Sequence, residues 1–155
     1  MARTTQNSKR IHASPEKIFK ALTDPRGLEH WQVPGDMTGK VHEYDLREGG
    51  SYTMSLFYPE GEGNPGKTSG QEDRYTAIFE KLDAPYKIVE RVKFDAEAAE
   101  FSEEMIMEIT LESMGDDTNV TFQFRNIPEG ISLKDNEKGT ISSLEKLARY
   151  VEGAP

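Results

Sequence analysis

Residues 105–125 read MIMEITLESMGDDTNVTFQFR. Apolar side chains occupy alternate positions in both halves of this stretch, and polar side chains fill most of the positions between them. Alternation of this kind is typical of a strand with one buried and one solvated face. Residues 115–117, GDD, separate the two halves and have the composition of a hairpin turn. The stretch therefore predicts two antiparallel strands in a sheet that is covered on one side.

Two further stretches indicate strands of the same sheet. Residues 51–58 alternate in the same way, and residues 86–94 follow a turn at residues 83–85. A shorter strand over residues 10–13 is expected to lead into the domain. The polar residues 1–9 are expected to be flexible and frayed. An antiparallel sheet is thus predicted for the middle of the chain.

Two short helices are predicted before this sheet. Ser14 can cap the first one with its hydroxyl, and Pro15 suits the first helical position because an N–H group there would have no partner. The pair Asp24-Pro25 ends that helix and begins a second one that reaches Trp31.

A longer amphipathic helix is predicted after the sheet. Ser132 and Asp135 have the spacing of a capping box, with Asp in place of the usual Glu, and Gly153 supplies an end. The apolar face of this helix consists of Ile141, Leu144, Leu147, Ala148 and Val151. We therefore expect one α+β domain over residues 10–153, in which the last helix covers the apolar face of the sheet.

The composition excludes several classes of function. The 155 residues carry 19 Lys and Arg against 28 Asp and Glu, a net charge of −9. Nucleic acids and anionic lipids bind through basic side chains, so neither is an expected partner. The chain has no cysteine, which excludes disulfides, thiolate metal sites and a cysteine nucleophile. No apolar run has the length of a membrane span and no signal peptide is visible, so we expect a cytoplasmic protein.

One glycine-rich stretch matches a nucleotide-binding motif. Residues 61–68, GEGNPGKT, satisfy the P-loop pattern. Helical spacing after the motif is compatible with it and involves Tyr75, Ile78, Phe79 and Leu82. Glu60 and Glu62 count against it, because the oriented amides of a P-loop face anions. We therefore favour a glycine-rich hairpin loop.

Glu90 is the most informative polar residue. It shares strand parity with apolar neighbours and is expected to point inward. An inward carboxylate needs a partner or a raised pKa. We expect Glu90 to lie at the rim of a pocket or to form an ion pair with an arginine such as Arg47 or Arg91; the alternative is contact with a ligand or an acid/base role. The histidines lack metal-ligand spacing and no G-x-S-x-G elbow occurs, so neither a metal site nor a hydrolase triad is predicted.

Four motifs resemble those of a known family. They are HASPEKIFKALTDP with the following Leu28 and Trp31, DLREGGSY at residues 45–52, KLDAPYKIV at residues 81–89 and TNVTF at residues 118–122. Their order and character resemble the family called activator of Hsp90 ATPase homologue 1-like, which belongs to the START-like, or Bet v 1-like, superfamily. The resemblance covers residues 10–151.

This resemblance implies a helix-grip fold, in which a curved antiparallel sheet wraps around a long C-terminal helix and leaves a cavity. It also implies a strand, against the helical spacing, over residues 71–82. Two departures fall near the expected cavity mouth. Gly139 is followed by Thr140 where the family often has tryptophan, and the loop over residues 61–70 is long and polar. Both departures bear on the ligand and leave the fold unaffected.

The resemblance implies a ligand, because superfamily members bind apolar small molecules. We therefore predict that this chain binds a hydrophobic or amphipathic molecule. We predict neither a bound metal nor a cofactor. The residues expected to line its cavity are Trp31, Tyr52, Met54, Tyr75, Glu90, Met107, Phe122, Phe124 and Leu144. The family name implies a second function, contact with the chaperone Hsp90, and analogy implies a homodimer. A third alternative is a cyclase-like or hydrolase-like enzyme that uses the same cavity, with Glu90 or His42 as its acid or base.

Overall fold

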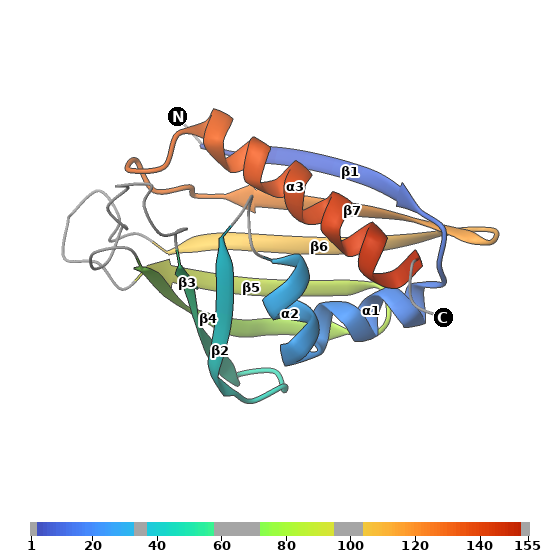
Figure 1. The fold of residues 1–155 in the computed structure, drawn as a ribbon, viewed down its shortest axis with the longest axis horizontal. Coiled ribbons are helices and arrows are strands. Elements are labelled where there is room, and N and C mark those ends of the chain that lie inside the picture. The colour runs from blue at the N-terminus through green and yellow to red at the C-terminus, as the bar shows by residue number, and fades with distance from the viewer. Residues whose placement is uncertain (1–2, 33–36, 58–71, 95–103, 153–155) are drawn as a thin grey trace.

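The computed structural model describes residues 3–32, 37–57, 72–94 and 104–152. In chain order the elements are β1 (Thr5–Ile11), α1 (Pro15–Thr23), α2 (Pro25–Trp31), β2 (Thr38–Tyr44), β3 (Ser51–Phe57), β4 (Glu72–Asp83), β5 (Lys87–Phe94), β6 (Met105–Met114), β7 (Asp117–Arg125) and α3 (Leu133–Glu152). Within these residues, one antiparallel sheet contains all the strands in the order β1-β7-β6-β5-β4-β3-β2. All three helices lie on one face of this curved sheet (Figure 1). The predicted α+β helix-grip fold is confirmed.

The strands bury alternate side chains against the helices, as their sequences predict. In β6 the buried positions are Met105, Met107, Ile109 and Leu111, and in β7 they include Val120, Phe122 and Phe124. The two strands are joined by Gly115 and Asp116, because Met114 lies opposite Asp117. Gly115 has a φ of 71°, a backbone conformation that glycine adopts without steric cost.

The predicted helix starts are confirmed by their hydrogen bonds. In each case a side-chain oxygen accepts a backbone N–H: Ser14 from Lys17 at 3.2 Å, Asp24 from Arg26 at 3.0 Å, and Ser132 from Asp135 at 2.9 Å. The predicted helix end at Gly153 lies outside the described residues.

Residues 72–83 form strand β4, as the family resemblance implies and the helical spacing does not. A P-loop leads into a helix, so this strand argues against the nucleotide-binding alternative. The motif itself, at residues 61–68, lies outside the described residues.

The first strand begins earlier than predicted. Thr5 to Ile11 pair in register with Phe124 to Thr118 of β7, so residues 5–9 are ordered strand and the expectation that they are frayed is wrong. Pairing with a sheet edge uses backbone groups, which polar and apolar residues supply equally. The Thr5 hydroxyl also donates a hydrogen bond to the Asn136 side chain of α3, which ties the start of β1 to that helix.

The buried stripe of α3 differs from the predicted one at its first turns. Ile141 has 46% of its surface exposed. The buried residues of the helix are Thr140, Ser143, Leu144, Leu147, Ala148 and Val151. The stripe therefore begins with hydroxyl-bearing residues, which a search for apolar positions passes over, and Ile141 lies outside it.

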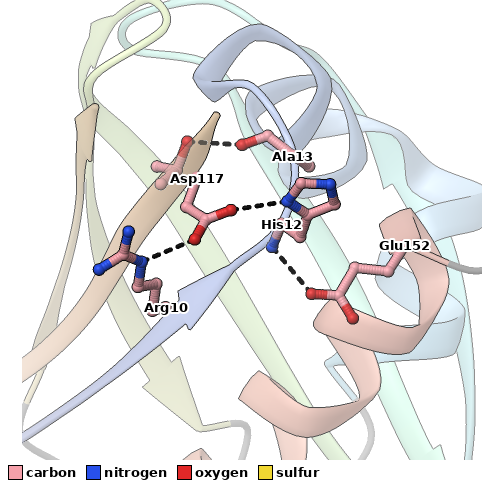
Figure 2. Close-up of polar contacts among 6 residues, drawn as sticks. Arg10, His12, Ala13, Asp117 and Glu152 are labelled. Carbon is pink, nitrogen blue, oxygen red and sulfur yellow. Dashed lines mark hydrogen bonds and ion pairs between the residues drawn. The ribbon is translucent and has the colours of Figure 1, made fainter. Parts of the chain in front are cut away.

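The C-terminal end of α3 is fixed to the strands below it by a cluster of polar contacts (Figure 2). The backbone N–H of His12 donates to Glu152 at 2.8 Å, and the His12 ring lies 2.7 Å from the Asp117 carboxylate. Arg10 donates to the same carboxylate at 2.7 Å. The hydrogen bond with Asp117 raises the pKa of His12 above its ordinary value. Helix α3, β1 and β7 are thus connected at one corner of the molecule.

The packing of α1 against α2 depends on one glycine. The Trp31 indole N–H donates to the backbone carbonyl of Ala21 at 3.0 Å, and both residues are buried. A Cβ atom at Gly27 would lie 2.5 Å from that same carbonyl oxygen. The hydrogen bond that fixes Trp31 therefore requires a residue without a side chain at position 27.

We expect Gly27→Ala to lower the free energy of unfolding by about 1–3 kcal/mol, because the added methyl group displaces the Ala21 carbonyl. The tryptophan emission should also shift to longer wavelength as Trp31 loses its packing. Urea unfolding monitored by fluorescence measures both effects. Arg26→Ala, at the exposed neighbouring position, is the control and should change neither quantity. A Gly27→Ala variant as stable as the wild type would contradict the close contact.

Candidate functional site

A cavity of about 250 Å³ lies between the first half of α3, the end of α2 and one end of the sheet. Strands β3 to β7 supply its floor. Its apolar lining consists of Trp31, Leu56, Val92, Phe94, Met105, Met107, Phe122, Phe124 and Ile131, together with the ring of Tyr75. The floor is continuous because Met107 pairs with Phe124 across β6 and β7, and Tyr75 pairs with Phe94 across β4 and β5.

The cavity exists because the first half of α3 presents short side chains to the sheet. Gly139, Thr140 and Ser143 line it from above. The second half of the same helix packs with Leu144, Leu147 and Val151, which are buried. Protein interiors are otherwise close-packed, so a row of short side chains opposite aromatic rings leaves empty space. The hollow is therefore encoded by the sequence of α3.

The structure brings together some of the residues predicted to line the cavity. Those that do line it are Trp31, Tyr75, Met107, Phe122 and Phe124. Four others do not: Tyr52, Met54, Glu90 and Leu144 are buried outside it. Their side chains lie on the same faces of the strands and of α3 as those of the lining residues. They are farther along these elements, however, where α1, α2 and the apolar half of α3 fill the core.

Glu90 is connected to the cavity through hydrogen bonds. Tyr52 donates its hydroxyl proton to the Glu90 carboxylate at 3.0 Å. The Gln32 amide nitrogen donates to the Tyr52 oxygen at 3.2 Å and also to the Tyr75 oxygen. Tyr75 in turn donates to the sulfur of Met54 at 3.2 Å. Gln32 and Tyr75 line the cavity, so this network joins the cavity wall to a carboxylate in the core.

The expected ion pair of Glu90 with Arg47 or Arg91 is wrong. Arg47 pairs with Asp45, and Arg91 pairs with Glu80 and Glu104. Glu90 projects from the buried face of β5, whereas its sequence neighbour Arg91 projects from the opposite face. A strand places adjacent residues on opposite faces, which is why the two cannot meet.

Burial controls the ionisation of this network. It raises the pKa of the Glu90 carboxyl from 4.5 to about 7, and the hydrogen bond from Tyr52 opposes this shift only in part. Burial, followed by the nearby Glu90 charge, raises the pKa of Tyr52 and of Tyr75 well above the ordinary value, so both rings keep their protons.

The polar lining of the cavity was not predicted. It comprises Gln32, Asp73, Ser132, Asp135, Asn136, Thr140 and Ser143. A signal was present in the sequence, because Asn136, Thr140 and Ser143 recur at helical spacing on one stripe of α3. Asp73 shares strand parity with Tyr75 and is 1% exposed. An aspartate in register with an inward tyrosine could have been identified in the same way as Glu90.

The remaining candidate residues lie elsewhere. His42, the alternative acid or base, contacts Ser55 at 2.8 Å and does not line the cavity. In the part of the chain that the structure describes, no three His, Asp or Glu side chains are grouped as metal ligands. No helix among those residues has the length and apolar character needed to cross a membrane.

Comparison with known proteins supports the fold and the family. The sequence model of the family described as "Activator of Hsp90 ATPase homolog 1-like protein" matches residues 12–152. The crystal structure of protein CV1439 from Chromobacterium violaceum is 27% identical, with a TM-score of 0.83, and the match covers 96% of this chain and 97% of that one. No curated protein matches this sequence.

Two more distant structures share the fold. Protein Ms6760 from Mycobacterium smegmatis is 18% identical, with a TM-score of 0.76 over 99% of this chain and 93% of that one. The AHSA1-like protein from Aeromonas hydrophila is 18% identical, with a TM-score of 0.69 over 96% of this chain and 93% of that one.

Glu90→Gln should stabilise the protein at alkaline pH. Between pH 4.5 and about 7 the folded protein keeps a proton that the unfolded chain releases, so its stability falls as the pH rises through this window. Glutamine can still accept the Tyr52 hydrogen bond but carries no charge. We expect a gain on the order of 3 kcal/mol at about pH 8 and a much smaller one at about pH 5.

Urea unfolding at the two pH values measures this difference. Glu112→Gln, at an exposed position of β6, controls for the general effect of removing a negative charge and should show no comparable pH dependence. A gain for Glu90→Gln that is equal at both pH values would show that Glu90 does not titrate in this window.

Proposed function

This chain belongs to the activator of Hsp90 ATPase homologue 1-like family, and from that premise we propose that it binds an apolar or amphipathic small molecule in the cavity between the sheet and α3. The observation that carries the proposal is the cavity itself, about 250 Å³ of space lined mainly by aromatic, aliphatic and methionine side chains. Concave apolar sites with a few polar groups are the general form of small-molecule sites.

The lining chemistry supports adaptable apolar recognition. Phe122, Phe124 and Trp31 supply large, flat contact areas, and Met105 and Met107 supply side chains that adjust to different shapes. An apolar cavity of about 150 Å³ is known to hold benzene. The larger volume here suits a molecule with two or three fused rings or a short branched chain.

The departure of α3 from the family pattern supports the same proposal. Thr140 is buried and lines the cavity, and it follows Gly139 at the position where the family resemblance implies a tryptophan. A tryptophan there would extend from the helix into the space that this chain leaves empty. The short side chain at position 140 is thus one reason why this chain has a cavity beneath α3.

The other functions expected from the sequence stay predictions. Contact with Hsp90, which the family description names, would use the surface of the protein, and retention on immobilised Hsp90 at micromolar concentration is its direct test. Self-association is tested by light scattering. An enzyme acting on the bound molecule would need Glu90 to work through Tyr52 and Gln32, since the carboxylate does not line the cavity.

Thr140→Trp should weaken the binding of a neutral apolar probe. We expect the uncharged dye prodan to bind the wild type with enhanced, blue-shifted emission. The indole side chain at position 140 should fill the cavity and weaken this binding by at least about tenfold, a loss of about 1.4 kcal/mol. Titration monitored through the emission of the dye measures both affinities.

Ile141→Trp is the matched control, since it adds the same side chain one residue away at an exposed position. It should leave prodan binding unchanged. Both variants should retain cooperative thermal unfolding. Equal binding of prodan by Thr140→Trp and the wild type would place the dye outside this cavity.

A further inference from the structure

A buried polar atom at the cavity wall has no hydrogen-bond partner among the described residues. It is the side-chain oxygen of Gln32, a residue that lines the cavity. The amide nitrogen of the same side chain donates to the hydroxyl oxygens of Tyr52 and Tyr75, so both of its N–H groups are used. The Gln32 oxygen therefore points away from the two tyrosines. A buried acceptor without a partner costs free energy, so this orientation of the amide needs a cause.

A negative charge on Glu90 accounts for this orientation. A carboxylate has acceptors only, so Tyr52 must donate its single proton to Glu90, at 3.0 Å. The Tyr52 oxygen can then only accept, and the Gln32 amide must turn an N–H group toward it. Tyr75 also acts as an acceptor for Gln32, because its own proton is donated to the sulfur of Met54. Ionised Glu90 thus leaves the Gln32 oxygen without a partner.

A neutral Glu90 favours the opposite direction of the same hydrogen bonds. Its O–H group is a donor, and in the arrangement above both this group and the Gln32 oxygen would lack a partner in the described residues. If the O–H group donates to Tyr52 instead, Tyr52 can donate to the Gln32 oxygen once the amide has turned over. The last torsion angle of a glutamine has two nearly equivalent settings, so the turn needs no additional space. The N–H groups of Gln32 then lie where its oxygen was.

The surroundings of Glu90 allow both states, and no cation faces it in the described part of the chain. Its neighbours across β4 and β6 are Phe79 and Met107. The buried faces of α1, α2 and α3 contain no titratable side chain. Burial raises the pKa of Glu90 to about 7. Burial, followed by the charge of Glu90, also raises the pKa of the tyrosines around it, which keep their protons: Tyr44, Tyr52 and Tyr75.

We propose that Glu90, although it lies outside the cavity, determines which hydrogen-bonding group Gln32 presents to the ligand. With Glu90 ionised the wall offers an oxygen, and with Glu90 neutral it offers an N–H group. A hydroxyl group can donate and accept, so it fits both states, whereas a carbonyl group fits only the second. The ligand class is therefore an apolar molecule with a neutral hydroxyl group. This inference rests on the proposed function and names the polar part of its ligand.

The test compares 2-adamantanol with 2-adamantanone, which share one apolar skeleton and carry no charge. Calorimetric titration measures the affinity of each. We expect the ketone to bind about fivefold more weakly at about pH 8.5 than at about pH 5.5, because its oxygen then faces the oxygen of Gln32. The affinity of the alcohol should change by less than about twofold between the same pH values.

Two variants test the hydrogen-bond chain from Glu90 to Gln32. Glu90→Gln is neutral and can donate to Tyr52, so at about pH 8.5 it should bind the ketone as tightly as the wild type does at about pH 5.5. Tyr52→Phe interrupts the chain while Glu90 still titrates, and it should also remove the pH dependence of ketone binding. Glu112→Gln, at an exposed position of β6, is the control and should keep this dependence.

The outcomes separate this inference from the proposed function. Equal ketone affinity of the wild type at the two pH values overturns the inference. A pH dependence that persists in Glu90→Gln or Tyr52→Phe also overturns it, since another group such as Asp73 on the cavity wall would then be responsible. If prodan binds but neither adamantane probe does, the inference is overturned and the proposed function stands. If prodan also fails to bind, the proposed function is overturned and the inference falls with it.

Discussion

A helix of twenty residues can present only one continuous stripe to the sheet beneath it, and in α3 that stripe changes chemistry halfway along. Leu144, Leu147 and Val151 close the core over one half of the sheet. Gly139, Thr140 and Ser143 leave the other half uncovered by apolar side chains. Both the core and the cavity therefore depend on the same helix lying at one fixed rotation and one fixed depth.

Several contacts hold α3 in that position. At its start the Ser132 cap and the contact between Thr5 and Asn136 connect it to the preceding turn and to β1. At its end Glu152 accepts from the backbone of His12 (Figure 2). Between these points the apolar half packs against the sheet and against α1 and α2. The helix is thus fixed at both ends, and the space beneath its first half persists without a side chain to fill it.

The core also contains a polar network. Its hydrogen bonds hold the side chains in fixed positions, but it requires the burial of an ionisable carboxyl group, that of Glu90. Hydrogen bonds connect Glu90, Tyr52, Gln32 and Tyr75, and all of these residues except Gln32 are buried. In a buried region a carboxylate is difficult to ionise, and a hydroxyl that points at it has one preferred orientation. The network therefore fixes the position of Gln32 and Tyr75 at the cavity wall, so the wall is ordered before any molecule binds.

The elements of the fold were largely predictable, because strand alternation and helix caps are local properties. Residues 105–125 specified their hairpin, and Ser14, Asp24 and Ser132 specified helix starts. Residues 72–83 needed the family resemblance, since their local spacing favoured a helix. The start of β1 was missed because edge pairing through the backbone leaves no pattern in polar side chains.

The cavity was only partly predictable, because strand parity tells which face a residue occupies and not how far along the sheet the hollow extends. Trp31, Tyr75, Met107, Phe122 and Phe124 were placed correctly in it. Tyr52, Met54 and Glu90 have the same strand parity but lie farther along the sheet, under the helices, and Leu144 belongs to the apolar half of α3. Their exclusion depends on where α1 and α2 pack, which is a tertiary property. The polar lining was missed because the search for a pocket considered large apolar residues first.

The division of α3 has a consequence for how such a protein can diverge. Substitutions in its first half alter the shape of the hollow while the apolar second half continues to support the fold. New cavity shapes are then accessible through single substitutions that need no compensating change in the core. Related chains with this architecture can therefore differ in the shape of the cavity through a few positions on one helical turn.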